Sequence, residues 1–376
     1  MQRPNFTDRT FNAPADRVLQ VLEDIANHVR ILPNFHFSHS RYTPRALEPE
    51  LFNSLQQLST QHQDDYLRWR LGSYLFSLYE GGGNPLPIEP RAEAASLSTP
   101  QDRPFQNAAL GVHSPFYERL HARNTGKGYF DPRWQVLRQE RDGLFAVRKD
   151  GLTVHVGDRH LQTSTIAAGN TVSIRLPSNC IENGCYVAIG NAGPCQKDSS
   201  NPAPRVDLFF NLNLEGVIDG MQYFTNALND LNLPFTFAVP YDEERCREAR
   251  IAATLTIHKG DYQAIQPILA RFWIGHADRF RPEVPLFSKT LVPGLALAEQ
   301  PLHPFIPQEN FGMNRFQIIA AGAIDAWRQK KTSSSEREAF ILKSFRNHQV
   351  DLRYPYLNNP SLNHEEDDGY SFAIHS

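Results

Sequence analysis

The chain has few cysteines, methionines and tryptophans, and it carries no excess of either charge. Four Cys, three Met and four Trp occur in 376 residues, and 38 basic side chains nearly balance 41 acidic ones. A duplex-binding protein usually shows a basic excess, so the composition argues against that class. The cysteines are Cys180, Cys185, Cys195 and Cys246, with no CxxC pair and no His-rich partner segment. We therefore expect reduced, buried thiols rather than a structural zinc site.

Long apolar runs and small-molecule motifs are also missing. No segment approaches the ~18 apolar residues of a membrane helix, and residues 1–12 lack the apolar core of a signal peptide. The chain contains no GxGxxG after a strand, no P-loop, no HExxH and no GxSxG. We therefore expect a cytoplasmic protein without a cofactor that neither spans a membrane nor binds nucleic acid.

The order of the predicted elements indicates an α+β fold. The hydrophobic share of 40%, with 24 Phe and 13 Tyr, is ample for a core. Helices are expected first, over 15–32 and over 47–79 with a possible break near Thr60, and strands mixed with helices follow. A Pro-, Ala- and Ser-rich stretch separates these parts. The expected segments are an N-terminal helical region (1–83), a linker or loop (84–105), an α+β domain (106–346) and a polar, loosely held tail (347–376).

Within the α+β part, alternation of apolar and polar residues predicts several strands. They cover 144–149, 152–156, 171–176, 185–190, 206–210, 235–239 and 252–257. Helical spacing of apolar residues predicts helices over 214–228, 261–280 and 316–327.

The first two of these strands flank Asp150-Gly151, a strong signal for a two-residue hairpin. With these two residues as the turn, Lys149 pairs with Leu152, Arg148 with Thr153 and Ala146 with His155. Arg148 and His155 then lie diagonally on one face, roughly 7 Å apart, and Lys149 points to the other face. The alternative is a hairpin whose polar face is simply solvated.

Other polar side chains are predicted on strand faces opposite the core. Arg205, Asp207 and Asn211 share such a face, and His258 points outward at the end of a later strand. Arg315 opens a helix, where a cation is unfavourable unless an anion is near. Two interpretations stay open: Glu309 neutralises Arg315, or Arg205 and Arg315 converge to bind a phosphate.

An ordered set of motifs resembles the HopA-type family, which is named for a type III secreted effector of plant-pathogenic bacteria. The set comprises Arg205-Val-Asp-Leu-Phe-Phe-Asn-Leu, Glu215-Gly216, Pro285-Leu-Phe-Ser-Lys-Thr, Pro293-Gly-Leu-Ala-Leu-Ala-Glu299 and Gly312-Met-Asn-Arg315. Gly128-Tyr-Phe-Asp-Pro132, Gly151-Leu-Thr-Val-His155 and Gly190-Asn-Ala-Gly193 are similar to bacterial, especially cyanobacterial, relatives. The resemblance extends from about residue 126 to residue 327.

The resemblance implies two functions. Effector members of the family contact immune proteins inside plant cells. Stand-alone bacterial members resemble lyases of lanthipeptide and thioamitide pathways, in which a separate kinase phosphorylates Ser or Thr of a precursor peptide. The lyase then removes the phosphate by β-elimination and leaves dehydroalanine or dehydrobutyrine. The implied partners are therefore a phosphorylated precursor peptide and its kinase, and the implied chemistry requires no metal.

Such an elimination needs a base for the Cα proton, cations for the phosphate and an acid for the leaving oxygen. His155 is the candidate acid, and Lys149 or Lys289 is the candidate base. The candidate phosphate ligands are Arg205 and Arg315, followed by Arg148 and Arg175, with Asn211, His258 and Glu309 in support.

One departure from the family pattern bears on the base. A lysine commonly follows the aromatic residue on the strand before the Tyr241 loop, and Ala238 stands there in this chain. The position of an Asp-Ser pair before the next strand is likewise taken by Ile251-Ala252. Because alanine cannot accept a proton, the sequence leaves a second reading open. In that reading the chain is a weak or inactive relative that binds a (phospho)peptide or acts as an effector-type interaction protein.

Overall fold

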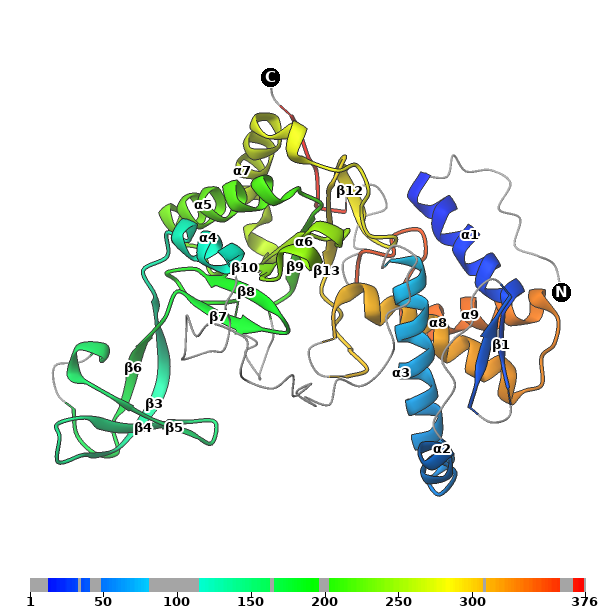
Figure 1. The fold of residues 1–376 in the computed structure, drawn as a ribbon, viewed down its shortest axis with the longest axis horizontal. Coiled ribbons are helices and arrows are strands. Elements are labelled where there is room, and N and C mark those ends of the chain that lie inside the picture. Colours follow the sequence, from blue (N-terminus) through cyan, green and yellow to red (C-terminus); the bar gives the residue numbers. More distant parts are fainter. Residues whose placement is uncertain are drawn as a thin grey trace. The chain divides into compact units, whose positions relative to one another are not determined.

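The protein is described by a computed structural model over residues 13–32, 35–40, 49–80, 115–162, 166–195, 203–306, 309–358 and 368–374. It contains both helices and antiparallel sheets, so the predicted α+β class is confirmed (Figure 1). No helix of these residues is long and apolar enough to cross a membrane. The expected linker, 84–105, lies outside the described residues.

Contacts between Cα atoms divide the chain into two compact units. The first unit combines Met1–Pro104 with Pro282–Gly369, and the second combines Phe105–Arg281 with Tyr370–Ser376. This division differs from the segments expected from the sequence. The reason is that the N-terminal helices pack against helices of the C-terminal third, which no local sequence pattern reports.

The first unit is mainly helical. In chain order its elements are α1 (Ala13–His28), β1 (Val29–Ile31), β2 (Phe37–His39), α2 (Pro49–Gln56), α3 (Thr60–Tyr79), β12 (Lys289–Val292), β13 (Leu295–Glu299), α8 (Phe311–Arg328) and α9 (Ser334–Asn347). Helix α8 packs against α3 on one side and α9 on another, and α1 also packs against α9. A Cβ atom on Gly322 of α8 would lie 2.6 Å from the Cα of Ile341 in α9, so this close helix pair requires glycine there.

The described residues test three further expectations from the sequence. The helix expected over 15–32 ends at His28, because residues 29–31 pair with β2 as a short strand instead. The break expected near Thr60 is confirmed, since α2 ends at Gln56 and α3 begins at Thr60. The tail is not loosely held where it is described, since Tyr356, Leu357 and Tyr370 are buried.

The second unit contains a five-stranded antiparallel sheet with the order β9-β11-β10-β8-β7. Its strands are β7 (Asn179–Glu182), β8 (Cys185–Ile189), β9 (Arg205–Phe210), β10 (Phe235–Pro240) and β11 (Ala253–His258). Helices α4 (Pro115–Arg123), α5 (Leu214–Asp230), α6 (Glu243–Glu248) and α7 (Tyr262–Gly275) complete this part. Four of the five strands and the helices α5 and α7 lie where the sequence pattern predicted them.

An aromatic cluster holds α5 and α7 on the five-stranded sheet. Phe224 of α5 lies 4.7 Å from Phe272 of α7 and 5.5 Å from Phe237 of β10, between ring centroids. All three side chains are fully buried. Such ring pairs add to the stabilisation that burial of the apolar area already provides.

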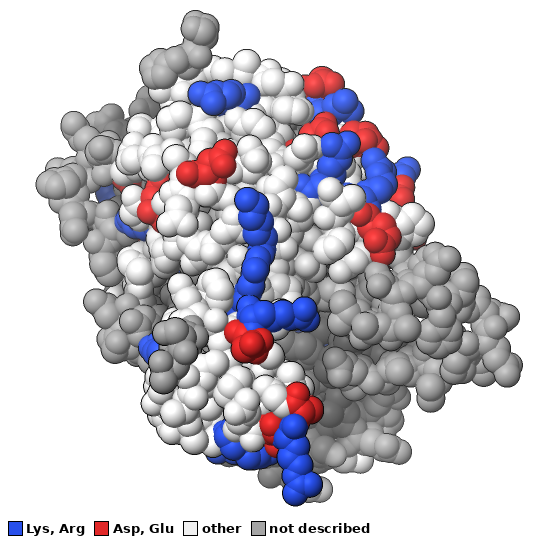
Figure 2. All heavy atoms as spheres, turned by 90° about the vertical axis from the view of Figure 1, so that its left-hand side faces the viewer, with Lys and Arg blue, Asp and Glu red and all other residues white. Residues whose placement is uncertain are grey.

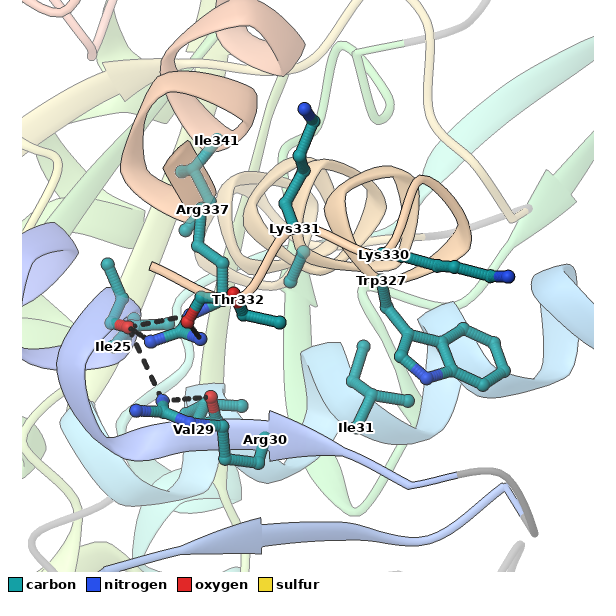
Figure 3. Close-up of a pocket in the computed structure, with 12 residues that line it drawn as sticks. Ile25, Val29, Arg30, Ile31, Trp327, Lys330, Lys331, Thr332, Arg337 and Ile341 are labelled. Carbon is teal, nitrogen blue, oxygen red and sulfur yellow. Dashed lines mark hydrogen bonds between the residues drawn. The ribbon is translucent and has the colours of Figure 1, made fainter. Parts of the chain in front are cut away.

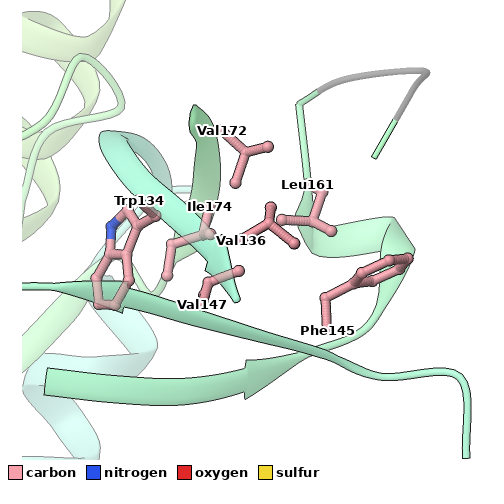
Figure 4. Close-up of a cluster of buried hydrophobic side chains, with 7 residues drawn as sticks. All are labelled: Trp134, Val136, Phe145, Val147, Leu161, Val172 and Ile174. Atoms are coloured by element: carbon pink, nitrogen blue, oxygen red, sulfur yellow. The ribbon is translucent and has the colours of Figure 1, made fainter. Parts of the chain in front are cut away.

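The second unit also contains a four-stranded sheet with the order β5-β4-β3-β6 (Figure 1). It is formed by β3 (Tyr129–Gln139), β4 (Phe145–Lys149), β5 (Leu152–Val156) and β6 (Thr171–Leu176). One face carries its own apolar cluster, formed by six side chains of β3, β4 and β6 and by Leu161 from the segment between β5 and β6. Figure 4 shows its members: Trp134, Val136, Phe145, Val147, Leu161, Val172 and Ile174. Asp150 and Gly151 both have positive φ, 47° and 81°, as a tight hairpin turn requires.

Candidate functional site

The outer face of the four-stranded sheet, opposite the apolar cluster, brings together three of the predicted site residues. Arg148 pairs with Thr153 and with Gln135, and Ala146 pairs with His155, so the predicted hairpin register is confirmed. Gln135 in turn pairs with Thr171 of β6, and Arg175 lies four residues further along that strand, about 13 Å away at the usual rise per residue. We use the name outer face for Gln135, Arg148, Thr153, His155, Thr171, Ser173 and Arg175.

The two arginines of the outer face are exposed and hold only neutral partners. Arg148 Nε donates to the Thr153 hydroxyl at 3.4 Å, and an Arg175 guanidinium nitrogen donates to the Lys127 carbonyl at 2.7 Å. Among the ion pairs of the described residues, neither arginine has a carboxylate partner. Figure 2 shows this side of the molecule, where acidic side chains lie beside some of the basic ones but not beside all of them.

His155 differs from its arginine neighbours because it is paired with a carboxylate. Its Nε2 lies 3.1 Å from Glu140 Oε1, and the same oxygen accepts from Arg138 at 2.7 Å. Arg138 first and His155 second hold the pKa of Glu140 below its usual range. His155 also shares the outer face with Arg148, as the predicted acid and phosphate ligand would.

Lys149 points to the opposite face, as predicted, and forms an ion pair there. Its Nζ donates to Asp131 at 2.6 Å and lies 6.0 Å from the centre of the Trp134 ring. The Trp134 indole donates to the same Asp131 oxygen at 2.6 Å. An ammonium held by a carboxylate is a poor proton acceptor, so this geometry does not suit a base for elimination.

Lys289, the other candidate base, lies in the first unit and is also held by a carboxylate. Its Nζ donates to both oxygens of Asp368, at 2.7 and 2.5 Å. The Tyr356 hydroxyl donates to Asp368 as well. Burial, followed by the neighbouring Asp368, raises the pKa of Tyr356, so this hydroxyl stays protonated. Both candidate bases are therefore parts of ion pairs.

Arg315 is a buried structural cation. Its Nε donates to the Pro355 carbonyl at 2.9 Å, and another nitrogen donates to Asn314 Oδ1 at 2.7 Å. The guanidinium also lies 4.7 Å from the centre of the Phe311 ring. Burial lowers the pKa of Arg315 to about 10, against the opposing effects of Glu299 and Glu309. The residue thus fastens the segment 355–357 onto α8.

Glu309 reaches Arg315 through an intermediate rather than directly. Asn314 Nδ2 donates to Glu309 Oε2 at 2.9 Å, while the Asn314 oxygen accepts from Arg315. Glu309 Oε1 is buried without a hydrogen-bond partner among the described residues, and burial raises the pKa of this carboxyl. Of the two open interpretations, the chain Arg315–Asn314–Glu309 favours internal neutralisation, with Glu299 as a further anion that the sequence did not suggest.

Arg315 also lines a cavity of about 260 Å³ in the first unit. Its polar walls include His303, Asn314, His348 and Asn358. Because the guanidinium is only 2% exposed, it contributes little surface to a ligand in this cavity. Arg205 belongs to the second unit, so its convergence with Arg315 on a phosphate remains a prediction.

The polar face predicted for β9 is not exposed. Asp207 and Asn211 are 7% and 3% exposed, and Asp207 accepts a hydrogen bond from Thr256 at 2.6 Å. The prediction that these polar side chains lie on a face opposite the core was wrong, because Asp207 and Asn211 are both buried. Arg205 and its register partner His258 are half-buried at the end of the strand pair.

The four thiols are unbridged, and only two of them are buried as expected. Cys195 and Cys246 are buried, and burial raises the pKa of each to about 12, whereas Cys180 is exposed. Neither buried thiol is therefore suited to nucleophilic work. Among the described residues no group of His, Cys, Asp and Glu is arranged to hold a metal ion.

Sequence analysis missed the anionic partners of the predicted cations. Asp131 pairs with Lys149 across 18 residues, and Asp368 pairs with Lys289 across 79. Asp131 lies within a motif already noted, Gly128 to Pro132, but only the pairing of the strands in the folded sheet places it beside Lys149. Asp368, Tyr356 and Glu299 left no local signal, since each meets its partner only in the folded first unit.

A comparison with known protein families agrees with the resemblance seen in the sequence. The HopA1 effector protein family matches residues 176–357. An effector protein structure from Pseudomonas syringae pv. tomato strain DC3000 is 15% identical, covering 79% of this chain and 97% of that one, with a TM-score of 0.41. One from P. syringae pv. syringae strain 61 is 13% identical, covering 84% and 99%, also with a TM-score of 0.41.

No match is found among curated proteins. The family match begins later than the resemblance we saw, at residue 176, and extends further, to residue 357. It therefore includes α9 and the segment 355–357 that Arg315 holds, but not the four-stranded sheet. Residues 176–357 of this chain match the HopA1 effector protein family, and the match covers just under half of its length.

Proposed function

We propose that this chain is an effector-type interaction protein that binds a phosphorylated peptide and leaves its phosphate in place. One contrast among the predicted residues supports the proposal. Lys149 and Lys289 are each held by an aspartate, at 2.6 and 2.5 Å, whereas Arg148 and Arg175 have no carboxylate partner among the described residues. A site with cations but without an available base can hold a phosphate but cannot start an elimination.

The outer face of the four-stranded sheet offers suitable chemistry for such a ligand. Guanidinium groups form charge-assisted, often bidentate, hydrogen bonds with phosphate. The hydroxyls of Thr153, Thr171 and Ser173 lie on the same face and can bond the remaining oxygens or the peptide backbone. The peptide partner is expected to be phosphorylated on Ser or Thr by a separate kinase.

Mass spectrometry and binding together test this proposal. The full chain is incubated with a phosphoserine peptide and a phosphothreonine peptide, each labelled with fluorescein, and the unphosphorylated peptides serve as controls. We expect increased anisotropy with the phosphopeptides alone and no change in their mass. Arg148→Glu combined with Arg175→Glu should weaken binding by about tenfold or more, equivalent to at least one charge-assisted bond. The matched control is Arg271→Glu, an exposed arginine on α7, which should bind as the unaltered chain does.

Loss of phosphoric acid from the peptide is the second candidate outcome, and one observation favours it. Arg148 and His155 share the outer face, as a phosphate ligand and an acid for the leaving oxygen would. If the mass of the phosphopeptide falls by one phosphoric acid and His155→Ala stops the change, the chain is a phospho-Ser/Thr lyase. In that case the base would be a residue other than Lys149 and Lys289, because an aspartate holds each of these lysines.

A further inference from the structure

A second candidate binding surface lies in the first unit and does not depend on the proposed phosphopeptide site. It is a cavity of about 310 Å³ between α1, β1, the end of α8 and α9. Its floor is apolar: Ile25, Val29 and Ile341 are buried, and Ile31 and Trp327 are half-buried. Figure 3 shows the Ile31 side chain beside the Trp327 indole, with Lys330 extending beyond it.

Four cations surround this apolar floor. Arg30, Lys330, Lys331 and Arg337 all line the cavity. Lys331 Nζ lies 3.3 Å from Glu336 Oε1. Among the described residues, the other three cations form no ion pair with a carboxylate. Two of the four are fixed, because Arg30 and Arg337 both donate to the Ala26 carbonyl near the end of α1. Lys330 is exposed and follows the end of α8 with a φ of 54°.

Strand β1 adds a hydrogen-bonding edge to the same cavity. It pairs with β2 in an antiparallel register that places Ile31 opposite Phe37, and the Leu32 amide donates to the His36 carbonyl at 2.7 Å. Because paired and unpaired positions alternate in an antiparallel ladder, the amide and carbonyl of Ile31 point away from β2. Among the described residues β1 has no other strand partner. The Val29 carbonyl accepts from an Arg30 guanidinium nitrogen at 2.8 Å, so an extended segment can add to this edge at Ile31.

We propose that this cavity binds an extended acidic peptide that carries a large aliphatic or aromatic side chain. The apolar side chain fits against Ile31 and Trp327, and a neighbouring carboxylate meets Lys330, which is exposed and has no ion-pair partner among the described residues. The peptide backbone pairs with the outer edge of β1, a recognised mode of peptide capture in which alternate side chains give the specificity. The surrounding positive charge selects an acidic ligand over a basic one.

The test uses fluorescence anisotropy with the full chain and three short labelled peptides. One alternates glutamate with leucine, one alternates lysine with leucine, and one alternates glutamate with serine. We expect binding of the first alone, weakened by added salt. Lys330→Glu should weaken it by about tenfold, as loss and reversal of one close charge imply. Trp327→Ala should weaken it further, because the apolar side chain loses its main contact.

Matched controls separate recognition from loss of folding. Lys343→Glu makes the same charge change on α9 outside the cavity, and it should bind as the unaltered chain does. Circular dichroism of every variant must match the unaltered chain, and a Trp327→Ala variant that does not fold is replaced by Ile31→Ser. A glutamate–leucine peptide with N-methylated leucines should not bind, because it cannot pair with β1.

Several results would overturn the proposal. Equal binding of all three peptides shows a surface without selectivity, and no binding of the first peptide shows that the cavity is not a peptide site. Equal loss in Lys330→Glu and Lys343→Glu shows a general charge effect. Binding to phosphatidylserine vesicles that Lys330→Glu abolishes, without binding of the peptide, assigns the cations to a lipid surface instead. None of these outcomes affects the phosphopeptide test, which changes residues of the second unit.

Discussion

Arginine has opposite roles in the two units. Arg315 in the first unit is fully enclosed, donates to the backbone of 355–357 and faces Glu299 and Glu309. Arg148 and Arg175 in the second unit stand in solvent with a hydroxyl and a carbonyl as their partners. A buried guanidinium must donate its hydrogen bonds to acceptors of the protein itself, since an unpaired buried charge is strongly destabilising. The comparison teaches that the arginine most attractive by motif is the one least able to bind a ligand.

The largest expected effect comes from breaking the buried network. Arg315→Met keeps most of the volume but leaves Glu299, Glu309 and two carbonyls without their cation. We expect the free energy of unfolding to fall by about 3–5 kcal/mol, the range seen when a buried charge loses its partner. Urea denaturation followed by circular dichroism measures it. Arg148→Met is the control and should stay within about 0.5 kcal/mol; equal losses would show that burial does not distinguish the two arginines.

An intermediate effect is expected at Lys289, which is only partly enclosed. Lys289→Met removes the ammonium from Asp368, and we expect a loss of roughly 1–2 kcal/mol, between exposed and buried pairs. A double-mutant cycle with Asp368→Asn measures the coupling between the two side chains. Zero coupling would mean that the pair does not hold Lys289, and the argument against Lys289 as a base would lose its support.

A pH dependence sharpens the description of the first unit. Burial raises the folded-state pKa of Glu309, so its contribution to stability is complete below the unfolded pKa of about 4.3. That contribution declines as the pH rises through the higher folded value. Glu309→Gln removes the titration, so the variant should gain stability relative to the unaltered chain as the pH rises from about 4 to 7. Denaturation midpoints measured across this range provide the test, and a constant difference would contradict it.

The smallest effect is expected at Glu140 on the four-stranded sheet. Arg138 and His155 lower the pKa of Glu140. The carboxylate therefore contributes to stability above its unfolded pKa, and this contribution is lost as the pH falls through the lower folded pKa. Because the Glu140 side chain is partly exposed and Arg138 is exposed, solvent and salt screen the interaction. Glu140→Gln should therefore leave the thermal unfolding midpoint unchanged at neutral pH. A clear drop would show that this face, like the first unit, depends on its charges for stability.

Local patterns predicted much of the second unit. The Asp150-Gly151 turn set the register of β4 and β5, and with it the shared face of Arg148 and His155. Helices α5 and α7 followed from apolar spacing alone. Helix α9 was missed although its capping box, Ser333 with Glu336, is a recognisable signal. The end of α1 could not be predicted, because Val29 and Ile31 fit the helical pattern and only their pairing with β2 decides otherwise.

The sequence by itself determined the α+β class and the hairpin geometry, and its motifs carried the resemblance to the HopA-type family. Only the tertiary structure decided which cations have anions beside them. Periodicity and turn chemistry act over a few residues, whereas Lys289 meets Asp368 at a separation of 79 residues, and Arg315 meets its backbone acceptors at separations of 40 and 42 residues. The charge state and accessibility of a side chain depend on such distant neighbours, so they can be read only from the folded units.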